Sequence, residues 1–416
     1  MSKPQCGRWL KRSFARPDMA RYAFLTWDGA GNQPPAVGIA QLLIDRGHEV
    51  AFAGYPGQRE YFGARGFRFL PLQCSSATWK DLPPPSMFEV KLRSAWAAAE
   101  HLLDVPKLLA GEQPDALIVD CLMFGALAVL ESAGVPTMVL VHSAPGALLP
   151  PGGPFEARLL DMVNHVRGEA KRPPLKNLWA AWETFPTVCT SVRDLDPLAA
   201  EAPKSFEYIG PIFERAVPSV WQSPWSPQDR RPLVLVSFST GPYWDQRSRI
   251  ERTLSALAER PCRILVTPGR TDVSGIAVPF NATLATELPH GRVLPHVAVT
   301  VTHAGHGTVA ASLLHGVPLV CLPNPAADQP ALAAQVEALG AGRSLDGEKA
   351  TPEEIAAAVD NVLADPSYAS RARSLSAVIA GMHGTAAAVD RLEKLAQSVH
   401  LGALADMPNG SSLQPR

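Results

Sequence analysis

One segment decides the fold of this 416-residue chain: Val299–Gln335, with the sequence VTVTHAGHGTVAASLLHGVPLVCLPNPAADQPALAAQ. Its apolar start predicts a buried β-strand, which leads through the turn His303–Thr308 into a helix. Gly305 and Gly307 allow a ligand to approach the backbone closely, and the unpaired N–H groups of a first helical turn favour an anion. The turn therefore predicts a site for phosphate groups, to which the side chains of a histidine and a threonine add donors.

A second polar loop follows the next predicted strand, at 317–322. Asp328 and Gln329 open the helix after that strand, and a carboxylate beside an amide suits the binding of vicinal hydroxyl groups. The carboxyl ends of parallel strands lie along one rim of a sheet. We therefore expect phosphate recognition and sugar recognition on adjacent loops.

The rest of the chain alternates apolar strands with helices, once before and once after a proline-rich segment. Strands are predicted at 22–26, 49–53, 67–70, 116–120, 137–141, 233–238, 263–267, 297–302 and 317–322. Helices are predicted, among others, at 89–109, 329–339, 352–363, 369–379 and 386–399. Continuous apolar strands separated by helices are typical of parallel sheets that are covered on both faces. The predicted fold class is α/β, with two doubly wound, Rossmann-like domains that face a cleft.

The segment between Pro203 and Pro232 holds six prolines and few periodic residues, and it marks the domain boundary. We expect an N-terminal domain at 19–215, a linker at 216–232 and a C-terminal domain at 233–401, whose last helix can pack back on the first domain. Residues 1–18 are basic without an apolar core and are predicted to be a disordered extension, and residues 402–416 a polar tail.

Composition excludes several classes of partner. The chain has 38 Lys and Arg against 39 Asp and Glu, so its net charge of -1 offers no footprint for nucleic acid or an anionic membrane. No apolar stretch is long enough for a transmembrane segment. The six cysteines lie far apart without a Cys-x-x-Cys, which argues against a disulfide scaffold or a structural zinc site and favours the cytoplasm. We expect a small-molecule partner.

The segment resembles the signature of nucleotide-sugar-dependent glycosyltransferases, the UDP-glycosyltransferase and bacterial antibiotic and macrolide glycosyltransferase family. The matching residues are His303, Gly305, Thr308, Gly316-Val317-Pro318, Pro323 and Asp328-Gln329. The resemblance implies the GT-B fold and inverting, metal-independent transfer of a hexose from a UDP- or dTDP-sugar to a hydroxyl of a hydrophobic small molecule. It implies no cofactor beside the nucleotide sugar.

The same resemblance implies roles for residues of the C-terminal domain. The diphosphate would be held by His303, Gly305, His306, Gly307 and Thr308, flanked by Ser239 and Thr240, with Leu288 in the loop that holds the base of the nucleotide. Asp328 and Gln329 would hold the sugar. The chain departs from the family at Ala304, where a glycine is usual, and at Ala311, where a ribose-binding Glu is frequent.

The general base is the largest departure. The resemblance implies a histidine in the N-terminal loop, oriented by an aspartate at the end of the fourth strand. Asn32 stands at the histidine position and Asp120 matches the aspartate. An amide cannot remove a proton, so three candidates remain: Asp120, which is the first choice, Asp28 in the same loop, and His142 at the end of the next strand. An acidic acceptor that needs no base is a fourth solution, and Asn32 would then orient the acceptor.

Simpler interpretations stand beside these. Asp120 can cap a helix, Asp28 can form an Asx-turn, and His303-x-x-His306 can suggest a metal, although no carboxylate accompanies it. Two other functions remain open: a nucleotide-sugar-binding auxiliary protein that has lost its base, and an epimerase or hydrolase of the same fold. Core packing explains each aromatic side chain of two further segments about as well as a pocket for a flat, apolar acceptor does; the residues are Trp79, Met87, Phe88, Trp96, Phe155, Met162, Trp179 and Trp182.

Overall fold

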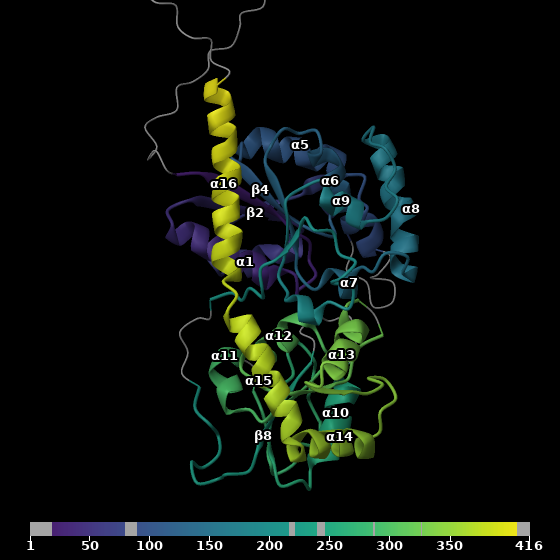
Figure 1. Ribbon diagram of the computed structural model, residues 1–416, viewed down its shortest axis with the longest axis vertical. Coiled ribbons are helices and arrows are strands. Elements are labelled where there is room, and N and C mark those ends of the chain that lie inside the picture. Colours follow the sequence, from purple (N-terminus) through teal and green to yellow (C-terminus); the bar gives the residue numbers. More distant parts are fainter. Residues whose placement is uncertain are drawn as a thin grey trace, which may run out of the picture.

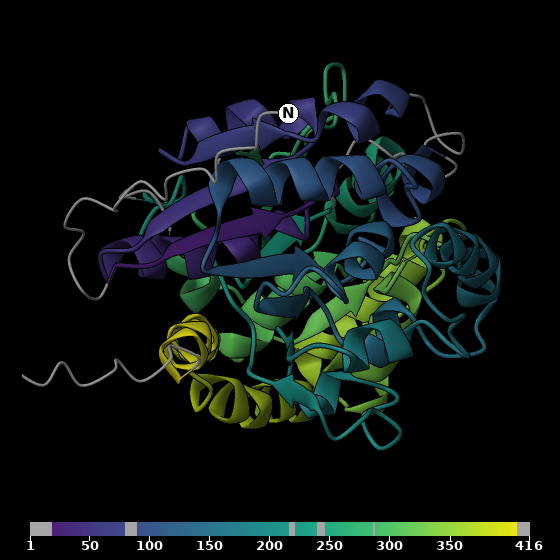
Figure 2. The ribbon, with the colours of Figure 1, turned by 90° about the horizontal axis from the view of Figure 1, so that it is seen from above.

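The computed structural model describes residues 19–79, 90–215, 221–238, 246–285, 288–325 and 327–405, with side chains as far as residue 398. Two α/β domains follow one another along the long axis of the molecule (Figure 1). Viewed along that axis, the N-terminal domain lies in front of the C-terminal one (Figure 2). The prediction of two doubly wound domains is confirmed by the two separate parallel sheets.

The N-terminal sheet has the strand order β3-β2-β1-β4-β5-β6-β7, and every pair is parallel. Its strands are β1 (Arg21–Leu25), β2 (Glu49–Gly54), β3 (Arg68–Pro71), β4 (Ala116–Asp120), β5 (Thr137–Val141), β6 (Thr187–Cys189) and β7 (Phe206–Tyr208). β4 and β5 are buried at every residue, as expected for central strands covered on both faces. The order reverses beside β1, so β1 and β4 form the switch point at which open α/β sheets bind ligands.

Helices cover both faces of this sheet. The N-terminal domain contains α1 (Gln33–Asp45), α2 (Arg59–Gly63), α3 (Gln73–Thr78), α5 (His101–Glu112), α6 (Phe124–Leu130), α7 (Pro145–Leu148), α8 (Pro154–Glu169) and α9 (Trp179–Glu183). α1 and α2 bury apolar side chains against one face, and α5, α6, α8 and α9 against the other. Each face thus has its own apolar core.

The C-terminal sheet has the order β10-β9-β8-β11-β12-β13 and is also parallel. Its strands are β8 (Leu233–Ser237), β9 (Arg263–Thr267), β10 (Ala282–Leu284), β11 (Val299–Thr302), β12 (Leu319–Cys321) and β13 (Gly342–Ser344). Its helices are α10 (Arg247–Leu257), α11 (His290–Val293), α12 (His306–Leu314), α13 (Gln329–Ala338), α14 (Pro352–Ala364) and α15 (Pro366–Ala380). α10 and α14 cover one face, and α12, α13 and α15 the other.

The last helix, α16 (Gly384–Ala405), returns to the N-terminal domain (Figure 1). Val389 and Leu392 are fully buried in the same core as α1. Arg46, just after α1, forms ion pairs of 2.7 Å with Asp390 and with Glu393. Helix α16 therefore ties the two domains together.

Two predicted boundaries are wrong. The predicted helix 89–109, whose first residue lies outside the described residues, is divided into a π-helical turn, Leu92–Trp96, and α5. Ala97 leaves the helical region at φ -116° and ψ 44°, and the carbonyl of Ala98 packs where a Cβ on Gly125 would be 2.3 Å away. Close packing against α6 thus interrupts the helix. The predicted tail from 402 is also too long, since α16 continues to Ala405.

Among the residues that the structure describes, none of the helices is both long and apolar enough to span a bilayer.

Candidate active site between the two sheets

The predicted site residues come from loops at the carboxyl ends of strands in both sheets. Asp120 ends β4 and His142 follows β5, while His303 follows β11 and Asp328 precedes α13. The two sets face each other, because Ser143 Oγ donates a hydrogen bond of 2.6 Å to Asp328 Oδ2 across the domain boundary. The tertiary structure therefore gathers residues from both domains into one site.

Asp120 is a buried carboxylate with a full set of hydrogen-bond donors. Oδ1 accepts from the indole Nε1 of Trp27 and from the backbone N–H of Leu122, both at 3.0 Å. Oδ2 accepts from Asn32 Nδ2 at 3.0 Å and lies 3.0 Å from Nδ1 of His142. Burial raises the pKa of Asp120, but the charge of His142 and these hydrogen bonds outweigh it, so the pKa lies below its usual value. Asp120 is thus held as a carboxylate.

His142 is the partner of that carboxylate. Burial lowers the pKa of His142, yet the charge of Asp120 and the hydrogen bond to it raise the pKa above its ordinary value overall. Its side chain retains 11% exposure, and the described part of the chain provides no partner for Nε2. The geometry is that of a histidine oriented by an acid through one of its two ring nitrogens.

Asn32 is buried at the start of α1 and donates a hydrogen bond to Asp120. Besides Asp120, Nδ2 donates to the carbonyl of Trp27 at 3.1 Å and to Thr26 Oγ1 at 3.3 Å. A Cβ on Gly29 would lie 2.8 Å from Asn32 Oδ1, so glycine is needed where the loop passes over the amide. The amide nitrogen of Asn32 is therefore engaged within the protein, whereas its Oδ1 has no hydrogen-bond partner among the described residues, and a role of Asn32 in orienting the acceptor stays a prediction.

Asp28 lies in the same loop, where its carboxylate accepts a hydrogen bond of 3.3 Å from Gln33 Nε2. A Cβ on Gly57 would meet Asp28 Oδ2 at 2.5 Å, which places that oxygen against the turn after β2. Burial lowers the pKa of Lys91 to about 8, and the charge of Asp28 opposes part of this decrease. Asp28 is thus engaged by residues of its own loop and its neighbours.

The turn His303–Thr308 connects β11 to α12, as the sequence predicts. His303 is buried, and desolvation lowers its pKa to about 4, so the free protein carries a neutral imidazole at pH 7. A Cβ on Gly305 would lie 2.5 Å from His303 Nε2, whereas a Cβ on Gly307 would meet nothing within 4 Å. Gly305 thus makes room for the histidine ring, and Gly307 faces open space.

Two neighbours in this turn carry further signals. Ala304 has φ +62°, the left-handed conformation that glycine adopts without strain, which explains why the family usually has glycine here. His306 is buried, its Nε2 has no hydrogen-bond partner among the described residues, and burial lowers its pKa to about 4. An unpaired buried nitrogen at the start of a helix is a position at which a ligand atom can complete the hydrogen bonding.

Asp328 and Gln329 start α13 on the same side of the sheet. Burial raises the pKa of Asp328, which is opposed by its hydrogen bond from Ser143 and by the charge of His142. Gln329 Oε1 accepts from Asn324 through the backbone N–H at 3.1 Å and Nδ2 at 2.8 Å. The loop after β12 is therefore held by its own side-chain network, and Ser143 and Asn324 are site residues that sequence reasoning missed.

Of the remaining predicted contacts, Ser239 and Thr240 lie outside the described residues. Leu288 packs partly buried against the cluster of Leu233, Leu235 and Val293. It lies in the loop that leads from the carboxyl end of β10 to α11.

The described residues include one group of side chains with metal-ligand chemistry: Asp120, Cys121 and His142. The oxygens of Asp120 already accept four hydrogen bonds, and burial holds the pKa of the Cys121 thiol well above its usual range. A protonated thiol is a poor ligand and a saturated carboxylate has no free lone pair. The residues present do not fit a metal ion.

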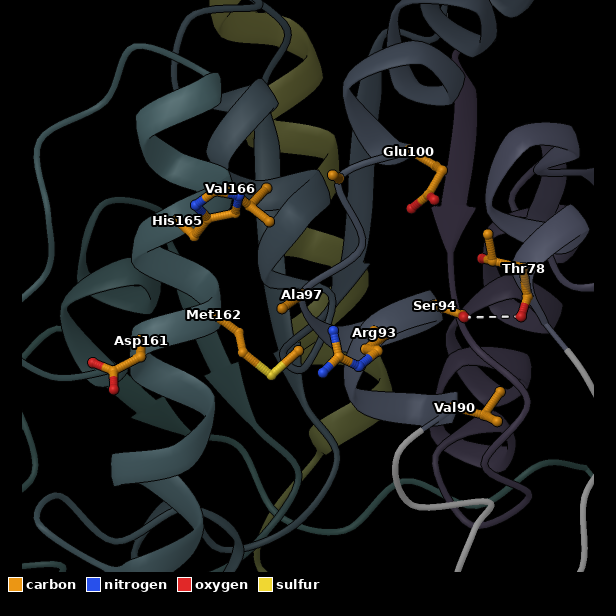
Figure 3. Close-up of a pocket in the computed structure, with 11 residues that line it drawn as sticks. Thr78, Val90, Arg93, Ser94, Ala97, Glu100, Asp161, Met162, His165 and Val166 are labelled. Carbon is orange, nitrogen blue, oxygen red and sulfur yellow. Dashed lines mark hydrogen bonds between the residues drawn. The ribbon is translucent and has the colours of Figure 1, made fainter.

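A cavity of about 700 Å³ lies in the N-terminal domain between the turn Leu92–Trp96 and α8 (Figure 3). Its lining combines apolar and charged groups, among them Val90, Arg93, Ala97, Glu100, Asp161, Met162 and His165. Met162 and Arg93 point toward its centre in Figure 3. The ring of Trp96, in the turn beside this cavity, packs edge-on against Trp27, 5.2 Å between ring centroids, and Trp27 in turn donates to Asp120.

The aromatic and methionine residues predicted for an acceptor pocket lie in different surroundings. Met162 lines the cavity, Met87 and Phe88 lie outside the described residues, and Trp79 packs against Tyr55. Of the two alternatives, core packing holds for Trp179 and Trp182, which are buried in the core beneath α6, where Trp182 Nε1 donates to the carbonyl of Cys121 at 2.7 Å. The driving force is burial of large rings beneath the sheet.

Comparison with known proteins agrees with this architecture. A family model described as "Erythromycin biosynthesis protein CIII-like, C-terminal domain" matches residues 251–395, and one described as "Glycosyl transferase 4-like domain" matches residues 33–167. The demethyllactenocin mycarosyltransferase of Streptomyces fradiae is 27% identical over 91% of this chain and 87% of its own.

Solved structures show the same fold. The glycotransferase of kitacinnamycin superimposes with a TM-score of 0.75 at 23% identity, covering 91% of this chain and 99% of that one. Glycosyltransferase VinC, solved in complex with dTDP, gives a TM-score of 0.64 at 18% identity over 91% of this chain and 100% of that one. The chain is therefore a glycosyltransferase of the GT-B fold, and its residues 251–395 match the erythromycin biosynthesis protein CIII-like, C-terminal domain.

Proposed function

We propose that this enzyme transfers a hexose from a UDP- or dTDP-sugar to a hydroxyl group of a hydrophobic small molecule, with inversion at the anomeric carbon and without a metal ion or further cofactor. The observation that carries the proposal is the hydrogen bond between Ser143 and Asp328. It brings the Asp120–His142 pair of one domain opposite the phosphate-binding type of turn in the other. The cytoplasm is the proposed location.

The turn His303–Thr308 provides the chemistry that a diphosphate leaving group needs. The free N–H groups at the start of α12 stabilise negative charge, and the neutral ring of His303 can donate one hydrogen bond. Gly307 leaves the approach open, and Nε2 of His306, which has no partner in the described part of the chain, offers one more polar contact. The complex of the similarly folded VinC with dTDP supports a thymidine or uridine diphosphate as the carrier.

The sugar would lie between the two domains, beside Asp328 and Gln329. A carboxylate held beside an amide can accept hydrogen bonds from neighbouring hydroxyl groups. Because the leaving diphosphate is bound by the C-terminal domain and the Asp120–His142 pair belongs to the N-terminal domain, attack and departure take place on opposite sides of the anomeric carbon. Displacement in this geometry inverts the configuration.

The cavity beneath Trp96 supports an acceptor of moderate size, since about 700 Å³ matches the usual volume of small-molecule sites. Its apolar lining suits a hydrophobic acceptor, while Arg93, Glu100 and Asp161 call for polar substituents on it. The mycarosyltransferase relative acts on demethyllactenocin according to its name, which supports a natural product as the acceptor class.

Thermal unfolding with nucleotides tests the donor site. UDP, dTDP, GDP, ATP and NAD are added separately, each with and without EDTA, at about 100 times the dissociation constant, where a ligand stabilises the fold by roughly 2.7 kcal/mol. We expect stabilisation by UDP or dTDP that EDTA does not change and that His303→Ala removes. Stabilisation by NAD alone would overturn the assignment of the turn.

Transfer itself is tested by product analysis with the nucleotide sugar that stabilises the protein, with and without an acceptor. One observation favours a different function: Asn32 occupies the loop position at which the family has its base, which is compatible with an auxiliary protein that binds the donor only. Such a protein gives no product in either assay. A hydrolase or epimerase gives product without an acceptor, whereas the proposed transferase requires one.

A further inference from the structure

The proton of the acceptor hydroxyl requires a base, and the loop that holds Asn32 does not contain a histidine. We propose that His142, at the carboxyl end of β5, is the general base of the transfer reaction, and that Asp120 is the positioning residue that orients it. This inference rests on the proposed transferase function and specifies the residue that takes up the proton.

The contact between the two side chains defines which nitrogen reacts. Nδ1 of His142 lies 3.0 Å from Asp120 Oδ2, so Nδ1 carries the proton of the neutral ring and donates a hydrogen bond to the carboxylate. Nε2 then keeps its lone pair, and the described part of the chain provides no partner for it. A histidine in this tautomer is ready to accept a proton through Nε2.

Asp120 itself is a poor candidate for the base. Each of its oxygens already has two partners: Trp27 and Leu122 at Oδ1, and Asn32 and His142 at Oδ2. A carboxylate with four donors has no lone pair left for an acceptor hydroxyl. The same hydrogen bonds weaken its basicity, because they stabilise its charged form.

Asn32 and Asp28 do not replace His142. The amide of Asn32 donates to Asp120, and Asp28 is held by Gln33 and by the turn at Gly57. Of the base candidates that the sequence offers, His142 alone combines an acid at one ring nitrogen with an unpartnered second nitrogen in the described structure.

His142 lies where it can take the proton from an acceptor that attacks a bound sugar. The next residue, Ser143, donates to Asp328 at 2.6 Å, so His142 lies directly beside the proposed sugar subsite. The titratable groups that face the ring are Asp120 and Cys121 at the end of β4, Asp328 before α13 and His306 at the start of α12. The ring thus lies between the acid of its own domain and the donor-binding loops.

The proposed step conserves atoms and charge. Nε2 of His142 takes the proton as the acceptor oxygen forms its bond to the anomeric carbon. The bond from that carbon to the diphosphate oxygen breaks, and its electron pair leaves with the nucleoside diphosphate. The resulting imidazolium is stabilised by Asp120 and later returns its proton to solvent.

The experiment compares the pH dependence of kcat/KM for the wild type, His142→Gln, Asp120→Asn and Asp28→Asn, with His383→Gln as a matched control. His383 is exposed in the connection before α16, and it is not among the residues that form the site. For the wild type we expect kcat/KM to rise with pH and reach a plateau. His142→Gln should lower kcat/KM about 10²- to 10⁴-fold and abolish the rising limb.

The other variants should retain that limb. In Asp120→Asn the limb should move to lower pH, because the imidazolium loses its carboxylate partner. Asp28→Asn and His383→Gln should keep the limb where it is. Stabilisation of each variant by UDP or dTDP, measured by thermal unfolding, shows that the variant is folded and that its donor site is intact.

Two results overturn the inference. If His142→Gln keeps the wild-type rate and limb while Asp120→Asn loses activity at every pH, Asp120 is the base. If His142→Gln is slower but its limb is unchanged, His142 has only a structural role. A wild-type protein that transfers no sugar refutes the proposed function itself, which separates that failure from an error about the base.

Should His142→Gln fail to fold, His142→Ala supplemented with imidazole provides a second test. The side chain of His142 is 11% exposed, so the space left by the ring is not completely enclosed. We expect imidazole to restore turnover to His142→Ala and to have no effect on Asp120→Asn. Lack of rescue in a folded His142→Ala that binds UDP or dTDP normally would count against proton transfer by His142.

Discussion

Ser143 Oγ donates a hydrogen bond of 2.6 Å to Asp328 Oδ2, and these residues belong to different domains, 185 positions apart in the chain. This contact joins the two halves of the candidate site. Asp328 is buried, and burial raises its pKa, so its charge depends on the groups around it. The domain that would hold the acceptor thus contacts the loop that would hold the donor sugar.

Ser143→Ala removes the donor to a buried carboxylate, which should lower the free energy of unfolding by about 1–3 kcal/mol. If the hydroxyl groups of the donor sugar also bind Asp328, this loss should shrink when the nucleotide sugar is present, but persist with the nucleotide alone. Urea unfolding under both conditions measures it. Ser132→Ala, which truncates an exposed serine, is the matched control. An equal loss in both conditions would place the sugar elsewhere.

Gly305 and Gly307 should respond oppositely to alanine. In Gly305→Ala the new Cβ would lie 2.5 Å from His303 Nε2, so the ring must move, and both stability and UDP or dTDP binding should fall. In Gly307→Ala the Cβ meets nothing, and a helical glycine replaced by alanine should gain up to about 1 kcal/mol. Nucleotide binding by Gly307→Ala should weaken nevertheless if the phosphates approach the backbone there. Calorimetric titration together with urea unfolding separates the two effects.

Acid should destabilise the protein through three buried histidines, His101, His303 and His306. Burial lowers the pKa of each to about 4, whereas the unfolded chain titrates near 6.5. Between these values the unfolded state binds more protons, so stability falls as pH decreases from 6.5 to 4. The full shift amounts to about 3 kcal/mol for each group.

The urea midpoint at pH 7, 6 and 5 checks this expectation. His101→Gln should flatten the decline, since it removes one of the three groups. His165→Gln should leave the decline unchanged, because the side chain of His165 is 77% exposed. A decline that does not depend on His101 would show that other groups dominate acid unfolding.

Nucleotide binding should also depend on pH through His303. A bound diphosphate favours the charged imidazole, so binding raises the pKa of His303 from about 4 and takes up a proton. Affinity should therefore increase as pH falls through the interval between the free and bound pKa values and level off above it. Titration calorimetry in buffers of different ionisation enthalpy counts the protons. His303→Gln should abolish the uptake.

A histidine at position 32 should be able to replace His142. Asn32 Nδ2 lies 3.0 Å from Asp120 Oδ2, the same oxygen that contacts His142 Nδ1. We therefore expect the double variant Asn32→His with His142→Gln to exceed the kcat/KM of His142→Gln at least about tenfold, because Asp120 would orient the new ring. The single variant Asn32→His controls for damage to the buried start of α1. No gain in the folded double variant would show that a ring at 32 cannot reach the acceptor.

Much of the fold follows from local pattern. The strands β4 and β5 and the helices α13 and α14 appear within a residue of the predicted bounds, because long apolar runs and periodic helices carry strong signals. The missed strands β6, β7, β10 and β13 have only three residues each, and they form because a neighbouring strand provides their hydrogen bonds. The break at Ala97 likewise depends on a neighbour, since α6 packs against it.

The sequence alone determined the succession of strands and helices, the glycine-containing turn at His303 and the absence of a histidine at position 32, because each of these is a local property of residue types and spacing. The tertiary structure decided which side chains form the site. His142 meets Asp120 because β4 and β5 are adjacent and parallel, so their carboxyl ends lie together. Ser143 meets Asp328 because the two domains face each other at the same ends of their sheets. Hydrogen bonds act over about 3 Å, and only the packing of distant segments brings two residues that close.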